Sequence, residues 1–230
     1  MKTIGLLGGM SWESTDLYYQ QINRGIQREL GSLNSAQIIL NSINFAQIEI
    51  LQKQGKWKEA SDFLTREAIK LQNADVDGIA LCTNTMHICA PEIIDELNVP
   101  FLHIADATAQ AVLQKNIRHT ALLGTRFTME QNFYKYQLQS HDIKVTIPHV
   151  EDRKFVHKII YEELCCGQIH ESSRLQFIEI IRKLKNEGIQ GVVLGCTEIG
   201  MLLPDENILN IPLFDTTKAH VNQIIQFMLD

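Results

Sequence analysis

Hydrophobic residues along the chain gather into eight short runs, each bounded by polar residues, glycine or proline. The runs cover residues 3–9, 35–43, 77–83, 99–105, 119–125, 143–148, 191–197 and 211–215. The stretches between them predict helices: one capped by Ser14 or Thr15 and ending near Leu30, and others over residues 57–73, 91–97 and 216–229. Short buried strands that alternate with helices are typical of a parallel α/β fold.

The chain also contains an internal repeat. Three pairs of segments are similar: Leu6-Leu7-Gly8-Gly9 and Leu122-Leu123-Gly124-Thr125, DGIALCTNT (77–85) and QGVVLGCTE (190–198), and Asn98-Val99-Pro100 and Asn210-Ile211-Pro212. The pairs lie 116, 113 and 112 residues apart, so their order and spacing are preserved. We therefore predict two similar doubly wound parallel-sheet half-domains related by a pseudo-two-fold axis, with the active site in the cleft between them. The first half-domain would comprise residues 1–104 with the returning helix in 216–230, and the second residues 105–215.

Composition narrows the class of partner. The 230 residues are 45% hydrophobic, enough for a sizeable core. The formal net charge is −6 and Lys and Arg are scattered along the chain, which argues against a nucleic-acid or membrane partner. No uninterrupted hydrophobic stretch approaches about eighteen residues, and MKTIGLLGGMSWES at the start lacks the pattern of a signal peptide. We expect a cytoplasmic protein that binds a small molecule.

Five cysteines are present: Cys82, Cys89, Cys165, Cys166 and Cys196. They form no Cys-x-x-Cys pair and no Cys/His group with the spacing of a zinc site, so the sequence predicts neither a disulfide framework nor a metal centre. Cys89, Cys165 and Cys166 lie in helical patterns, where a cysteine is expected to act as a small buried hydrophobic residue.

The internal repeat aligns Thr83 with Cys196. Both residues follow a predicted strand and precede a predicted helix, and ligands of open α/β sheets bind at this end of the strands. Two facing halves would present Thr83 and Cys196 to opposite sides of one ligand, which is the geometry of proton exchange at a stereocentre. Cys82 lies one position earlier, so its side chain should point to the other face of the strand unless the strand end twists or bulges.

Several motifs resemble those of the cofactor-independent aspartate/glutamate racemase superfamily, over essentially the whole chain. They are LGGMS (7–11), TNT (83–85), LLGT (122–125) and GCTE (195–198). The longer segments GLLGGMSWEST, CTNTMH, FLHIADAT, LLGTR and GCTEIG most resemble a bacterial subgroup of amino-acid racemases. The usual catalytic pair of the superfamily is two cysteines, one in Cys-Asn-Thr and one in Gly-Cys-Thr; here Thr83 stands in the first position and Cys196 in the second.

The resemblance implies a homodimeric racemase that needs no cofactor, and the chain shows no pyridoxal lysine motif. Cys196 would act on the L-enantiomer and Thr83 on the opposite face, so that conversion from L to D has the larger kcat. A helix N-terminus would lower the pKa of the Cys196 thiol. Oriented N–H groups and hydroxyls would hold the substrate carboxylate and its developing charge. The candidate substrate-binding residues are Gly9, Met10, Ser11, Asn84, Thr85, Thr125, Thr128, Thr197 and Glu198.

Each of these residues also has a purely structural interpretation. The small polar side chains are also typical turn and cap residues, and Glu198 would either tune the thiol or favour the first turn of the next helix. His87 and His103 would assist proton transfer or be structural.

Substrate choice and reaction type also stay open. Members specific for aspartate use a basic residue in the region that corresponds to YEELCCGQ (161–168), which has none here, although Arg126 would be a substitute. A racemase with a broader substrate range, one that tolerates neutral or longer side chains, agrees equally well with the sequence. A single-cysteine decarboxylase or cis-trans isomerase of the same superfamily, and a two-lobed protein that only binds a small acid, are the alternatives.

Overall fold

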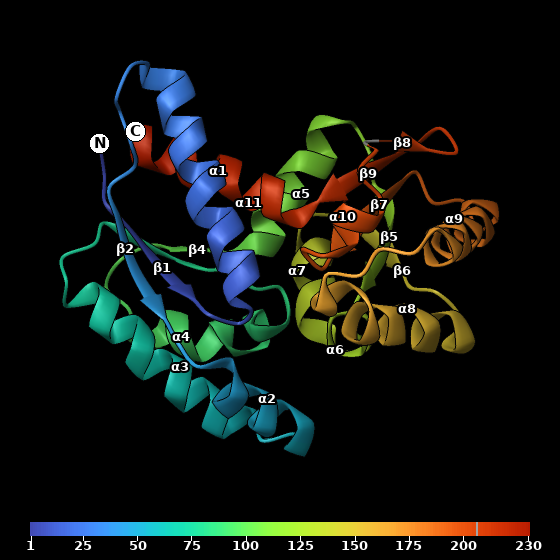
Figure 1. The fold of residues 1–230 in the computed structure, drawn as a ribbon, viewed down its shortest axis with the longest axis horizontal. Helices are drawn as coiled ribbons and strands as arrows, with labels where there is room; N and C mark the ends of the chain where they lie inside the picture. The colour runs from blue at the N-terminus through green and yellow to red at the C-terminus, as the bar shows by residue number, and fades with distance from the viewer. Residues whose placement is uncertain (206) are drawn as a thin grey trace. The chain divides into compact units, whose positions relative to one another are not determined.

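The computed structural model describes residues 1–205 and 207–230, which divide into two compact α/β units (Figure 1). The first unit contains Met1–Ile104 and His220–Asp230, and the second contains Ala105–Ala219. Each unit is built on a sheet whose main strands are parallel. The α/β class and the two parallel-sheet halves that the hydrophobic pattern and the repeat predict are therefore confirmed.

The sheet of the first unit has the strand order β2-β1-β3-β4. Its strands are β1 (Ile4–Gly8), β2 (Ile38–Ser42), β3 (Gly78–Leu81) and β4 (Phe101–Leu102). Its helices are α1 (Trp12–Leu30), α2 (Phe45–Gln54), α3 (Trp57–Gln72), the 3₁₀ helix η1 (Thr85–Cys89), α4 (Ala90–Glu96) and most of α11 (Thr216–Leu229). Because side chains alternate along a strand, Leu6 of β1 packs with α1 and α11, whereas Leu7 packs with α2 and α3. Helices thus cover both faces of this sheet.

The sheet of the second unit has the order β6-β5-β7-β9-β8, and β8 at its edge is antiparallel to β9. Its strands are β5 (His119–Gly124), β6 (Lys144–Thr146), β7 (Gly191–Gly195), β8 (Asn207–Ile208) and β9 (Ile211–Asp215). Its helices are α5 (Ile104–Gln114), α6 (Arg126–Glu130), α7 (Asn132–Ser140), α8 (Val150–Glu162), the 3₁₀ helix η2 (Leu164–Cys166), α9 (Glu171–Asn186) and α10 (Ile199–Leu202). Leu123 and Leu194 of the central strands pack in one core with residues of α8 and α9.

Strand register repeats between the two sheets. The equivalent pairs of opposed residues are Ile4–Gly78 and Thr120–Gly191, and Ile79–Phe101 and Val192–Leu213. These positions are related by the same offsets of 116, 113 and 112 residues at which the sequence repeats. Strand order and register are therefore shared, so the sequence repeat corresponds to a structural repeat.

All eight hydrophobic runs contain a strand, but the start of the first helix differs from the prediction. Ser11 is the N-cap of α1, because its Oγ accepts a hydrogen bond from the backbone N of Ser14 across 3.2 Å. Ser14 and Thr15, the predicted caps, lie inside the helix and are buried. Their hydroxyls instead donate to backbone carbonyls, that of Ser14 to Cys82 and that of Thr15 to Ser11.

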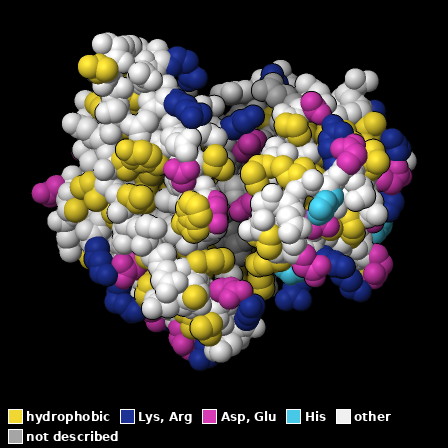
Figure 2. Space-filling model, in the orientation of Figure 1, with side chains coloured by type: hydrophobic (Ala, Val, Ile, Leu, Met, Phe, Trp, Pro, Cys, Tyr) yellow, Lys and Arg dark blue, Asp and Glu magenta, His cyan; other side chains and the backbone are white. Residues whose placement is uncertain are grey.

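The surface carries mixed charge. On the face in Figure 2, Lys and Arg side chains are interspersed with Asp and Glu over both units. Within the part of the chain that the structure describes, no helix is long and apolar enough to cross a membrane.

Candidate functional site

The first group of motif residues lies where two neighbouring strands end. Leu7 of β1 is opposite Leu81 of β3, so residues 9–11 and 83–85, which we call the first loop cluster, follow adjacent strands at the carboxyl edge of the sheet. The backbone N of Cys82 donates to the carbonyl of Leu7 across 2.9 Å, which extends the pairing by one step. Elements that are far apart in sequence thereby bring the LGGMS and TNT motifs together.

Gly9 is required at its place in this cluster. Its φ of 90° is in the region that favours glycine, and a Cβ there would lie 2.2 Å from the carbonyl oxygen of Ile43. The backbone N of Gly9 donates to Oγ1 of Thr15 across 2.8 Å. Ser11 caps α1, and Met10 is buried in the hydrophobic core. The turn and cap roles of Gly9 and Ser11 are thus present in the structure.

Thr83, Asn84 and Thr85 are largely buried, with exposed fractions of 8%, 5% and 8%. Cys82 has no exposed surface and packs in the hydrophobic cluster between the sheet, α1 and α11. Burial raises the pKa of the Cys82 thiol far above its ordinary value, so this thiol stays protonated at neutral pH.

His87 lies one turn after Thr83, in η1, and only 1% of its surface is exposed. Its Nδ1 is 2.7 Å from the carbonyl oxygen of Thr83, and its Nε2 accepts a hydrogen bond from the backbone N of Ile104 across 3.2 Å. Burial, followed by the neighbouring rings of His103 and His220, lowers the pKa of His87 well below its ordinary value. His87 is therefore a neutral ring with both nitrogens engaged.

The second group, which we call the second loop cluster, contains Thr125, Thr128 and residues 196–198. Gly124 of β5 is opposite Gly195 of β7, so the LLGT and GCTE motifs also follow adjacent strands. Thr125 is the N-cap of α6, with Oγ1 accepting from the backbone N of Thr128, and the two hydroxyls lie 3.2 Å apart. Thr128 is fully buried.

Cys196 is half-buried, and its environment is set by Glu198. The thiol donates to Oε2 of Glu198 across 2.9 Å, and the hydroxyl of Thr197 donates to the same oxygen across 2.5 Å. Burial, followed by the charge and the hydrogen bond of Glu198, raises the pKa of Cys196 well above its ordinary value. The expectation that a helix N-terminus lowers this pKa is wrong. The following helix, α10, has only four residues, and an acidic side chain stands beside the sulfur.

The prediction that Cys165 and Cys166 are buried is also wrong. Both are exposed, because they lie in η2, a single 3₁₀ turn at the end of α8, and not inside an amphipathic helix. Cys89 is buried as expected, and burial raises its pKa to about 11.

Two contacts near the clusters have no signal in the sequence. Ser14, whose position predicts only a helix cap, connects α1 to the loop after β3 by donating to the carbonyl of Cys82. His157 on α8 accepts from the backbone N of Arg126 across 3.2 Å, and burial, with Arg126 second, lowers its pKa. A lone histidine in an amphipathic helix gives no signal that would have found it.

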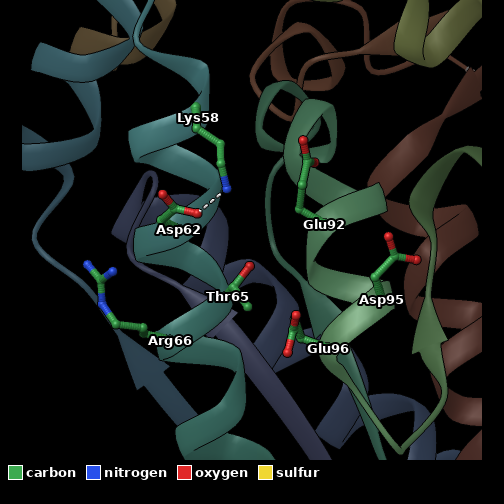
Figure 3. A pocket seen from close by; sticks show the side chains of 7 residues that line it. All are labelled: Lys58, Asp62, Thr65, Arg66, Glu92, Asp95 and Glu96. Carbon is green, nitrogen blue, oxygen red and sulfur yellow. Dashed lines mark hydrogen bonds and ion pairs between the residues drawn. The ribbon is translucent and has the colours of Figure 1, made fainter.

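The first unit also has a surface cavity, which is lined by residues outside the first loop cluster. It measures about 400 Å³ and lies between α3 and α4 (Figure 3). Its lining residues are Lys58, Asp62, Thr65, Arg66, Glu92, Asp95 and Glu96. None of the motif residues is among them, and the three acidic residues of α4 are exposed to solvent. Among the described residues, no group of three or more His, Cys, Asp or Glu side chains could hold a metal ion.

In both units, motif residues follow paired strand ends, and in the second cluster a thiol contacts a carboxylate. We compared the chain with known protein families. The Asp/Glu/hydantoin racemase family matches the chain over residues 7–224. This chain belongs to that family. The broad specificity amino-acid racemase RacX of Bacillus subtilis (strain 168) is 25% identical over an alignment 235 residues long, gaps included. This alignment covers 94% of this chain and 93% of the relative.

Solved structures extend the family match over the complete fold. A provisionally assigned Asp/Glu racemase from Yersinia pestis is 47% identical, with a TM-score of 0.95 and full coverage of both chains. An aspartate racemase homologue from Pyrococcus horikoshii OT3 is 33% identical, with a TM-score of 0.86 and the same coverage.

Other relatives are longer than this chain. Glutamate racemases from Hydrogenobaculum sp. and Carnobacterium sp. are 24% and 25% identical, and the chain spans 63% and 60% of their length.

Proposed function

We propose that this racemase-family protein is a cofactor-independent amino-acid racemase of the aspartate/glutamate type that interconverts L and D enantiomers. The observation that carries the proposal is the hydrogen bond from the Cys196 thiol to Glu198, at the strand end that the repeat equates with that of Thr83. We further propose that residues 1–104 with 216–230 and residues 105–215 act as two domains, whose loop clusters hold one substrate in a shared cleft.

Cys196 would work on the L-enantiomer. Its thiol proton passes to the carboxylate of Glu198, and the thiolate then removes the α-proton of the amino acid. Because its thiol pKa is raised, the thiolate, once formed, is a strong base, which suits a weakly acidic C–H bond. The same carboxylate acts as a proton store when the thiol returns the proton in the opposite direction.

Thr83 would serve the other face of the α-carbon. A threonine hydroxyl is too weak an acid to rest as an alkoxide, so we propose that it relays a proton from water to the carbanion. The hydroxide that this transfer leaves takes up, through solvent, the proton that Glu198 received from the thiol, which restores the resting carboxylate. The two faces then use unlike groups, and kcat and KM differ between the two directions. Enantiomers have equal free energy in water, so kcat/KM must be the same from L and from D.

The carbanionic intermediate needs stabilisation by groups that are oriented before the reaction. We propose that the backbone of Gly9, Met10 and Ser11 binds the carboxylate of the substrate, with the N–H groups of Met10 and Ser11 as donors and Gly9 as the open turn before them, because its own N–H donates to Thr15. The remaining proposed contacts are side chains of Asn84, Thr85, Thr125 and Thr197. Thr128 is fully buried, so we propose that it supports the site through its hydroxyl contact with Thr125. Fixed donors of this kind stabilise developing charge without having to reorient.

Aspartate, glutamate and related amino acids are the proposed substrates. RacX, which aligns over nearly the full length of both chains, is a broad-specificity enzyme. The region 161–168 of this chain has no Lys or Arg to select a side-chain carboxylate. These observations favour a substrate range wider than aspartate alone.

The test is proton NMR of the protein in deuterated buffer with L-aspartate, L-glutamate and L-homoserine in separate samples. Loss of the α-proton signal, abolished by Cys196→Ala and paired with formation of the D-enantiomer, is the expected result. Thr83→Ala should reduce inversion more than exchange of the L-enantiomer. Release of CO₂ from a malonate-like acid would instead favour a decarboxylase, double-bond isomerisation would favour a cis-trans isomerase, and binding without turnover would favour a two-lobed binding protein.

We also propose that the protein is a cytoplasmic homodimer. The homodimer is implied by the resemblance, and the cytoplasmic location is the expectation drawn from the sequence pattern. Light scattering coupled to size exclusion should give about twice the chain mass of 26.2 kDa. A mass of one chain at micromolar concentration would contradict the dimer.

A further inference from the structure

The ring of His87 connects the loop that carries Thr83 to the end of the next strand. Its Nδ1 contacts the carbonyl of Thr83 across 2.7 Å. Its Nε2 contacts the backbone N of Ile104, just after β4, across 3.2 Å. Both partners are backbone groups, and the ring is 1% exposed. The Thr83 loop is therefore tied to β4 by a side chain that water does not reach.

The partners determine where the ring proton is. A carbonyl oxygen can only accept a hydrogen bond, so Nδ1 must carry the proton and donate it to Thr83. A backbone N–H can only donate, so Nε2 must be the unprotonated nitrogen that accepts from Ile104. Protonation of Nε2 would break the second bond, and removal of the Nδ1 proton would break the first.

Neighbouring aromatic rings hold His87 in this orientation. The ring centroid of His103 is 4.5 Å away, that of Phe101 is 5.7 Å away and that of His220 is 6.1 Å away, all in edge contacts. His220 is itself anchored, with Nε2 donating to the carbonyl of Leu102 across 2.8 Å and Nδ1 accepting from the hydroxyl of Tyr18 across 2.9 Å. Packing thus restricts the position of the His87 ring, and its hydrogen bonds to Thr83 and Ile104 fix the orientation of the ring.

We infer that His87 is a positioning residue that sets the place of the Thr83 hydroxyl, through the hydrogen bond from Nδ1 to the Thr83 carbonyl. The inference rests on the proposed function, in which Thr83 serves one face of the α-carbon. His87 does not shuttle protons, because both of its nitrogens are engaged by the backbone. A proton relay demands positional accuracy, and a displacement of about 1 Å can cost on the order of a hundredfold in rate.

Three substitutions separate the hydrogen bond from the packing. In His87→Asn the side-chain amide can occupy the position of Nδ1 and donate to Thr83. In His87→Gln the carbonyl can occupy the position of Nε2 and accept from Ile104, but the donor to Thr83 is lost. His87→Phe keeps a ring and loses both hydrogen bonds. We expect His87→Asn to keep kcat within about threefold, and the other two to lose about ten- to a hundredfold with little change in KM.

A second readout reports on Thr83 alone. In deuterated buffer, His87→Gln should slow inversion of an L-amino acid more than it slows exchange of its α-proton, because Cys196 removes that proton. A general loss of structure would lower both rates by the same factor. Equal kcat in the Asn and Gln variants, or an unchanged ratio of exchange to inversion in the Gln variant, would overturn the positioning role.

The ring proton can be observed in the wild-type protein, independently of activity and of any variant that fails to fold. Long-range ¹H–¹⁵N correlation at pH 7 should show His87 as the neutral form with the proton on Nδ1. A proton on Nε2 would overturn the positioning role and leave the proposed function intact. A wild-type protein that racemises none of the amino acids tried would overturn the proposed function, and the positioning role with it.

Discussion

The thiol of Cys196 donates a hydrogen bond to Oε2 of Glu198, two residues further along the chain, across 2.9 Å. Thr197 donates to the same oxygen, so the carboxylate is held in place by two donors. An anion at this position opposes a second anion on the sulfur. The thiol is thereby kept protonated at rest, and the carboxylate is in place to accept its proton when a base is required.

Removal of this carboxylate should lower the pKa of the Cys196 thiol. In Glu198→Gln the like charge is lost and an amide can donate to the sulfur, so more thiolate exists at a given pH. We expect alkylation of Cys196 by iodoacetamide at pH 8 to accelerate on the order of tenfold, which corresponds to about one pKa unit. The measurement uses a Cys165→Ser/Cys166→Ser background. Glu171→Gln, which removes an exposed charge on α9, is the matched control and should leave the rate unchanged.

The five thiols should differ sharply in accessibility. Cys165 and Cys166 are exposed, whereas Cys82 and Cys89 are fully buried with raised pKa values. We expect two thiols of the native protein to react rapidly with a chromogenic disulfide reagent, and the two buried thiols to react only after denaturation. Cys196 is half-buried and should react more slowly than the two exposed thiols, so four or more thiols that react in the native protein would contradict the burial of Cys82 and Cys89.

Gly9 should tolerate a methyl group far less well than Gly55. Both have a positive φ, but a Cβ at Gly9 would lie 2.2 Å from the carbonyl oxygen of Ile43, whereas a Cβ at Gly55 would have no atom within 4 Å. Gly55→Ala should cost about 1 kcal/mol from backbone strain alone. Gly9→Ala should cost at least about 2 kcal/mol more, because backbone has to move. Urea denaturation of both variants gives the comparison, and similar losses would disprove the clash.

Stability should fall as the solution becomes acidic, in part because of His220. Burial lowers the pKa of this ring to about 3. Below about pH 6.5 the unfolded chain takes up a proton that the folded protein does not, so stability present above that pH is lost as pH falls toward 3. The slope from one such group is about 1.4 kcal/mol per pH unit. Between pH 5 and 6, His220→Gln should show a slope shallower by about one proton; an identical slope would contradict the prediction.

Much of the fold could be predicted because hydrophobic periodicity is local. Each of the eight apolar runs contains a strand, and α3 and α11 begin and end within one residue of their predicted limits. The short edge strand β8 was not predicted, since two residues give no period. The cap of α1 was misplaced because Ser11, Ser14 and Thr15 are all plausible caps. The structure decides among them, since Ser11 accepts from the backbone N of Ser14 while the Ser14 hydroxyl donates to Cys82 inside the helix.

The candidate site, like the fold, could be predicted from the sequence only in part. The repeat identified Thr83 and Cys196 as equivalent positions without any structure, because their spacing from the strand starts is preserved. The ionisation of Cys196 could not be predicted, since it depends on how deeply the sulfur is buried and on where the carboxylate of Glu198 points. For His87 the sequence favoured a structural role over proton transfer, and its two backbone partners could not be predicted.

The sequence by itself determined the class of fold, the duplication and the residue types available at each strand end, because all three are carried by order and spacing along the chain. The tertiary structure decided which of these groups touch. Distances between residues such as Ser14 and Cys82, or His220 and Leu102, depend on packing across the sheet, and no local pattern encodes them. Proton positions and pKa values follow from those contacts, so they too belong to the folded protein.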